Sequence, residues 1–155
     1  MKEGEIQKDL LLILEGVQMS YHYHSEKMFV VAFTYPLSVS GIPDSFLTQS
    51  PSKYCLEAMS DSRFYSISYE DLQELLGQYP NLRQLFQKMT EGMFLGTLQR
   101  TVELQAYNME ERFRAFAARS PHLFQLIPHK YLASYLNIAA TNFSKLYNRI
   151  KIGKI

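Results

Sequence analysis

Residues 127–150 of the chain, IPHKYLASYLNIAATNFSKLYNRI, decide how its fold is interpreted. Apolar residues recur at helical spacing in two short segments, one around Leu132 and one around Leu146. Between them lies Asn137, a residue type that tolerates the left-handed backbone of a tight turn. The second segment is basic. Two short helices, a tight turn and a basic second helix predict a helix-turn-helix.

The charge of the chain is divided unevenly along its length. The whole chain of 155 residues carries a net charge of +1, but residues 1–111 hold all fifteen acids and sum to −7. Residues 112–155 hold eight bases and no acid and sum to +8. A basic folded segment joined to an acidic one indicates a polyanionic partner at the basic end.

The first 70 residues favour β-strands. Residues 17–24 alternate apolar and polar side chains, the period of a half-buried strand, so we expect the polar set on this strand to face solvent. A short apolar run precedes it and ends in a turn at Gly16. Several short strands with turn signals predict an antiparallel roll or barrel. The candidate strands are residues 10–14, 17–24, 29–33, 54–59 and 64–68.

The pattern then changes to helices. Ser68 and Asp71 form a start like a capping box, and Asn108 and Glu111 form another. Residues 81–107 contain no proline and carry apolar side chains on more than one side. A helix of this kind needs two partners, such as its own sheet and a second protomer.

Composition excludes several functional classes. A single cysteine excludes an internal disulfide and a cysteine-held zinc or iron–sulfur site, and fits a reducing, cytoplasmic setting. No window approaches the ~18 consecutive apolar residues of a membrane-spanning helix. Nucleophile elbows, Gly-rich phosphate loops and zinc-protease motifs are all missing. We therefore expect no enzyme, no catalytic residue, no cofactor and no membrane partner.

Five groups of residues, taken in order, resemble the Crp/Fnr family of bacterial transcription regulators. The most specific is IPHKYLASYLNI at 127–138 followed by FSK at 143–145, which resembles the helix-turn-helix of the family. The likeness covers nearly the whole chain and is nearest to members from the Bacteroidetes. The other groups are KEGE at 2–5, ILEG at 13–16, SFL at 45–47 before SPS at 50–52, and EER at 110–112.

The resemblance implies an α+β fold in two domains. Residues 1–107 would form a cyclic-nucleotide-binding-like sensor, an antiparallel β-roll with a long dimerisation helix at 81–107. Residues 108–155 would form a C-terminal (winged) helix-turn-helix. Relative to the family, the roll is expected to be incomplete at its N-terminus. The sequence would then be a fragment, have a misplaced gene start, or be a genuine short form.

The function implied is that of a homodimeric DNA-binding transcription regulator whose partner is double-stranded promoter DNA. A helix beginning near Ala140 would enter the major groove, where asparagine can pair with adenine and lysine with guanine or a phosphate. The family's Thr-Pro-Glu start to this helix is Ala139-Ala140-Thr141 here, which lacks the N-cap hydroxyl and the acidic reader, so no known target sequence transfers. The residues expected at the DNA are Lys130, Thr141, Asn142, Ser144, Lys145, Asn148 and Arg149.

An unknown small-molecule effector would occupy the roll, with Gly41, Asp44 and Lys53 as its candidate residues. Cyclic AMP is not expected. The family holds the cyclic phosphate with an arginine beside a small hydroxyl residue. The matching loop at 50–53 contains no arginine. Without a bidentate arginine, an anionic phosphate loses its strongest contact.

Two other interpretations remain open. His22 and His24 follow Gly16 at the spacing that opens the cupin metal motif, but the rest of that motif is missing, so we expect no metal site. The chain could also be a sensor-only or protein-interaction module whose helix-turn-helix no longer binds DNA, because the helix start is altered and few residues follow Ile150.

Overall fold

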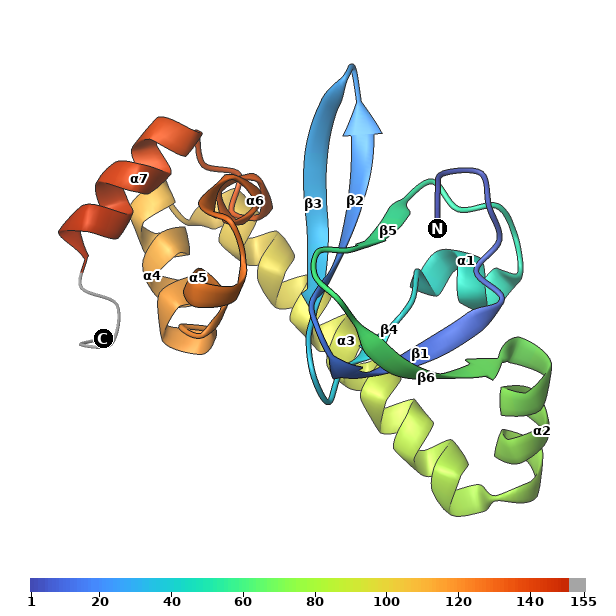
Figure 1. Cartoon of the computed structure of the whole chain (residues 1–155). Helices are drawn as coiled ribbons and strands as arrows, with labels where there is room; N and C mark the ends of the chain where they lie inside the picture. The colour runs from blue at the N-terminus through green and yellow to red at the C-terminus, as the bar shows by residue number, and fades with distance from the viewer. Residues whose placement is uncertain (151–155) are drawn as a thin grey trace. The chain divides into compact units, whose positions relative to one another are not determined.

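The computed structural model describes residues 1–150 (Figure 1). The chain divides into two compact units: the first runs from Met1 to Phe86 and the second begins at Gln87. None of the helices within residues 1–150 combines the length and the apolar composition that a membrane span requires.

The first unit contains two three-stranded antiparallel sheets. One sheet has the strand order β4-β1-β6 and the other the order β3-β2-β5. All five predicted strands are confirmed. The strands are β1 (Asp9–Glu15), β2 (Gln18–His24), β3 (Lys27–Thr34), β4 (Val39–Ser40), β5 (Cys55–Ala58) and β6 (Arg63–Ser68).

Gly16 makes the turn between β1 and β2, as predicted. Its φ of +89° lies in the left-handed region, and a Cβ built on it would lie 2.3 Å from the Ser62 hydroxyl and 2.5 Å from the Asp61 carbonyl. Both the backbone conformation and the space therefore require glycine. The turn leads the chain from one sheet to the other.

The expectation that the polar face of β2 lies in solvent is wrong for half of the strand. Gln18 is 3% exposed and Ser20 is 9% exposed, whereas His24 at the far end is exposed. Gln18 Oε1 accepts a hydrogen bond of 2.6 Å from the Ser40 hydroxyl. Because β2 lies between two strands and its first half is covered on both faces, the alternating pattern does not mark a solvent side there.

Two helices complete the first unit. The short α1 (Pro43–Thr48) begins with proline, whose fixed φ suits a first turn. The start of α2 (Tyr69–Gln78) is capped as predicted, because the Ser68 hydroxyl accepts a 3.0 Å hydrogen bond from the Asp71 amide. Phe46 of α1 is 1% exposed and meets the Tyr69 ring edge-on, so α1 packs against the start of α2.

The long helix α3 (Pro80–Ala106) confirms the helix predicted over residues 81–107 and begins one residue earlier, at Pro80. Several of its apolar side chains remain about half exposed or more within the described chain. Phe94, Leu98 and Val102 are spaced four residues apart and are 63%, 48% and 55% exposed. These three form a continuous apolar stripe on the helix surface.

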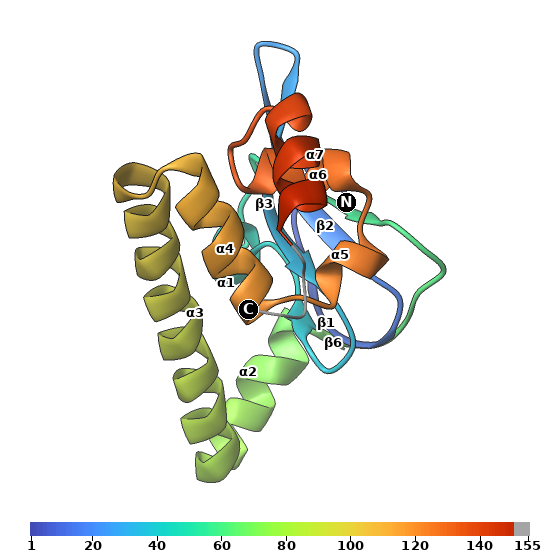
Figure 2. The ribbon, with the colours of Figure 1, turned by 90° about the vertical axis from the view of Figure 1, so that its left-hand side faces the viewer.

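The second unit is helical after α3, and Figure 2 shows α4, α6 and α7 gathered together. The predicted capping box is present: Asn108 accepts from the Glu111 amide, and Glu111 accepts from the Asn108 amide. The predicted wing lies outside the described residues. The helices are α4 (Met109–Arg119), α5 (Leu123–Leu126), α6 (His129–Tyr135) and α7 (Ala140–Arg149).

Candidate nucleic-acid interface

The turn between α6 and α7 has the backbone that the sequence predicts. Asn137 has a φ of +52°, in the left-handed region. The Asn137 amide donates to the Ser134 carbonyl over 3.0 Å, and the Ile138 amide donates to the Ala133 carbonyl over 2.9 Å. These two bonds satisfy the last carbonyls of α6 and reverse the chain within three residues. The helix-turn-helix is therefore formed as predicted.

One face of α7 is held in an aromatic core. Phe143 is 0% exposed, and its ring centroid lies 5.3 Å from that of Phe113 and 6.1 Å from that of Phe124. Leu146 and Ile150 are buried on the same side. Since side chains three and four positions apart share a face of a helix, this packing leaves the positions between them on the outer face.

The outer face of α7 presents most of the residues predicted to meet DNA. The Ser144 hydroxyl donates to the Ala140 carbonyl over 3.0 Å, which leaves its oxygen available only as an acceptor. Ala139 occupies the N-cap and offers no side-chain cap. Lys130 is exposed on α6, with Nζ 4.6 Å from the centroid of the Tyr131 ring. Thr141, Ser144, Lys145, Asn148 and Arg149 are exposed, and Asn142 is half-buried.

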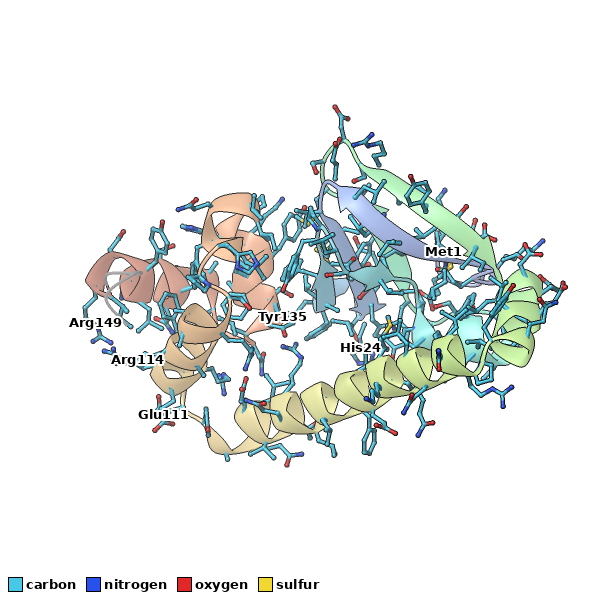
Figure 3. All side chains as sticks on the ribbon, turned by 90° about the horizontal axis from the view of Figure 1, so that it is seen from below. Met1, His24, Glu111, Arg114, Tyr135 and Arg149 are labelled. Atoms are coloured by element: carbon cyan, nitrogen blue, oxygen red, sulfur yellow. The ribbon has the colours of Figure 1, made fainter. Side chains whose placement is uncertain are left out.

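Arg149 is engaged by an acid of α4. Glu110 accepts hydrogen bonds from Arg149 and also from Arg114, whose Nη2 lies 2.8 Å from Glu110 Oε1. Figure 3 shows Arg114 and Arg149 on the same side of the helical unit. The Arg114 hydrogen bond, followed by the positive charges of both arginines, lowers the pKa of Glu110 below its usual value. A single carboxylate therefore partly neutralises two guanidinium groups.

The basic segment is consequently less positive at its surface than its composition predicts. Arg119 is paired with Glu103 of α3, so three of the arginines after residue 111 contact acids that precede it. Lys130 and Lys145 form no ion pair within residues 1–150. The unneutralised charge on the helix-turn-helix is thus concentrated on these two lysines.

Arg112 connects the start of α4 to the turn of the helix-turn-helix. Its Nη1 donates to the Tyr107 carbonyl over 2.8 Å and its Nη2 donates to the Asn137 carbonyl over 3.2 Å. Arg112 therefore fixes the position of the turn, although its residue type alone suggested only positive charge. Arg100 has a similar role, because its Nη2 donates to the Tyr135 carbonyl over 2.8 Å and its guanidinium lies 3.6 Å from the Tyr135 ring centroid.

The three predicted effector residues are Asp44, which lines a cavity in the first unit, and Gly41 and Lys53, which directly precede the lining residues Ile42 and Tyr54. Gly41 and Lys53 do not themselves line the cavity. The Lys53 side chain is exposed, and its backbone carbonyl lies 2.8 Å from His22 Nδ1. Among residues 1–150, no three histidine, cysteine or acidic side chains lie together as a metal site would require.

Comparison with known proteins gives one curated relative, the fumarate and nitrate reduction regulatory protein of Yersinia pestis. It is 26% identical over 166 aligned positions, which cover 99% of this chain. The chain spans 66% of the length of that relative. No family model matches the chain.

Solved structures show the same fold. FixK2 from Bradyrhizobium japonicum superposes with a TM-score of 0.79 at 16% identity, covering 95% of this chain and 76% of FixK2. CooA from Carboxydothermus hydrogenoformans superposes with a TM-score of 0.72 at 15% identity, covering 94% of this chain and 68% of CooA. The two sheets, the long helix and the helix-turn-helix therefore define a β-roll protein with a helical C-terminal domain.

The chain is thus similar to transcription regulators of the Crp/Fnr family, and the solved structures show that it shares their fold. Regulators of this family bind DNA and small-molecule effectors and form dimers. The shared fold also confirms the predicted α+β class.

Proposed function

We propose that the chain acts as a homodimeric transcription regulator that binds promoter DNA through α7 and responds to a small molecule held in the roll. Residues 108–155 are assigned to DNA binding, and residues 1–107 to sensing and dimerisation. The observation that carries the proposal is the outer face of α7. It presents Thr141, Ser144 and Lys145 while Phe143 and Leu146 hold the opposite face in the core.

The chemistry of this face suits base reading and phosphate contact. Asn142 can pair with adenine N6 and N7, and Lys145, which carries an unneutralised charge, can reach guanine or a phosphate. Lys130, Asn148 and Arg149 are assigned to the phosphate backbone, where contacts hold the register of the protein on the duplex. Arg149 must exchange Glu110 for a phosphate in order to do so.

Dimerisation is assigned to α3. The stripe of Phe94, Leu98 and Val102 places apolar surface where a second copy of the same helix would cover it. The effector would act by population shift, favouring one packing of the two long helices and so one spacing of the two copies of α7.

Selection of bound sequences from a random duplex library, with excess competitor DNA, tests the proposal. We expect an inverted repeat with half-sites about one helical turn apart, because a two-fold dimer presents two copies of α7. Absence of an enriched motif, with binding that vanishes at physiological salt, would overturn the proposal in favour of a sensor or protein-interaction module.

A further inference from the structure

The first unit contains a cavity of about 220 Å³ whose chemistry indicates the ligand it takes. It is formed by residues of β2, β3 and α1 and by the segment before β5, elements that Figure 1 labels. The volume is below the ~300 Å³ at which pockets for drug-sized ligands begin, so the cavity suits one small metabolite. Its lining residues are Ser20, Val31, Ile42, Pro43, Asp44 and Tyr54.

The lining has an apolar part and a polar part. Val31, Ile42 and Pro43 supply the apolar part. Ser20 is 9% exposed as a whole residue, and its hydroxyl makes no hydrogen bond within residues 1–150. The Ser20 hydroxyl is not among the buried unpaired polar atoms of residues 1–150, so it is accessible from the cavity and is an open position for a ligand atom.

The other two polar groups of the cavity are also unpaired. Asp44 is exposed at the mouth of the cavity, and its carboxylate accepts no hydrogen bond and forms no ion pair within the described chain. The Tyr54 ring meets the His22 ring edge-on, but its hydroxyl has no hydrogen-bond partner among residues 1–150. The cavity therefore offers three oxygen-bearing side chains, of which one is negatively charged.

The sign of the charge decides the class of ligand. None of the six lining residues is basic and Asp44 is the one charged residue among them, so the lining itself repels an anionic head and attracts a cationic one. An ammonium group has three N–H donors and no acceptor, which matches acceptor oxygens on Ser20, Asp44 and Tyr54. The apolar residues would cover the hydrocarbon part of such a molecule.

We propose that this cavity binds a small primary amine with an apolar body, and that a phosphate-bearing ligand is excluded from it. The inference deepens the proposed function, because it names the chemical class of the effector. It does not depend on whether α7 binds DNA.

A matched pair of probes tests the inference on the unmodified full chain. Tyramine and 4-hydroxyphenylacetate carry the same phenol ring but opposite charges, and cyclic AMP serves as the anionic phosphate. In calorimetric titrations we expect tyramine to bind at least tenfold more tightly than 4-hydroxyphenylacetate, and cyclic AMP to show no binding. Equal binding of the acid or of cyclic AMP, or no binding of tyramine at millimolar concentration, would overturn the proposal.

Substitutions locate the binding. We expect D44N to weaken tyramine binding at least fivefold and S20A to weaken it by a smaller factor. The control is D61N, since Asp61 is exposed and does not line the cavity. Unchanged tyramine binding in D44N, with its unfolding temperature equal to that of the wild type, would contradict the assignment. DNA selection with ligand-free protein separates this failure from a failure of the proposed function.

Discussion

Glu103 of α3 and Arg119 of α4 form a two-point ion pair inside the second unit. Arg119 Nη1 lies 2.7 Å from Glu103 Oε1, and Arg119 Nη2 lies 3.3 Å from Glu103 Oε2. The Glu103 side chain is only 7% exposed, whereas that of Arg119 is 41% exposed. The Arg119 hydrogen bonds, opposed by burial, lower the pKa of Glu103 below its usual value. The carboxylate depends on this arginine because little water reaches it.

Removing the arginine is expected to destabilise the second unit. R119A leaves Glu103 buried with only the Gln99 amide as its hydrogen-bond donor. We expect a loss of about 2 kcal/mol in the free energy of unfolding, less than for a fully buried pair because Arg119 is partly exposed. Urea unfolding followed by circular dichroism measures it. The control R114A breaks an exposed pair and is expected to cost clearly less than R119A; equal losses would contradict the prediction.

The same pair predicts a pH dependence. Because the pKa of Glu103 is lower in the folded chain than the usual 4.5, the unfolded chain binds the proton more readily. The contribution of Glu103 to stability is therefore complete above pH 4.5 and is lost as the pH falls through the folded pKa. Unfolding temperatures of wild type and E103Q across this range measure it. We expect the unfolding temperature of E103Q to fall less on acidification than that of the wild type. If the two proteins lose the same number of degrees, the ion pair does not contribute to stability.

Releasing Arg149 from Glu110 is expected to strengthen DNA binding. E110Q removes the charge that competes with a DNA phosphate for Arg149. Fluorescence anisotropy with duplex DNA over a salt series should show tighter binding, because Arg149 no longer gives up the Glu110 carboxylate when it contacts a phosphate. E74Q, an exposed change on α2, is the control. If R149A binds as E110Q does, Arg149 is not a phosphate contact.

Among the charged residues of the interface, Lys145 is expected to contribute most to the affinity for DNA. K145A should weaken DNA binding and reduce the magnitude of the salt slope by about 0.9, the value for one phosphate contact. K88A removes the same charge from an exposed position on α3 and should leave affinity unchanged. Unaltered affinity in K145A would show that α7 is not the recognition helix.

The apolar stripe of α3 predicts a dimer that a charge can disrupt. Leu98 is 48% exposed in the single chain, and L98E places a carboxylate in the middle of the stripe. We expect light scattering to give a dimer for wild type and a monomer for L98E. Q84E adds the same charge at an exposed polar position of α3 and should remain dimeric. A wild-type monomer at high concentration would refute dimerisation through α3.

Local patterns predicted the elements of this chain well. Both capping starts, at Ser68 and Asn108, and the left-handed turn at Asn137 occur where the sequence placed them. Each depends on residues within a few positions of one another, so nearby chemistry is sufficient to specify it. The fold class followed from the order of these elements and from the resemblance to the Crp/Fnr family.

Contacts between distant residues could not be predicted in the same way. Glu103 and Arg119 lie sixteen positions apart on two helices, and Glu110 meets Arg149 from thirty-nine positions away. Composition therefore overestimated the free positive charge of the C-terminal segment. The residue types that form these pairs also occur on solvated helix faces, so no local signal distinguished them.

The order of strands and helices, their ends and the helix-turn-helix follow from the sequence because backbone propensity, capping and periodicity act over short distances. The burial of Gln18 and Ser20, the unpaired oxygens around the cavity and the neutralisation of Arg149 were decided by the tertiary structure. Burial and electrostatic pairing depend on which distant segments pack together, and that information is not contained in any single stretch of the chain.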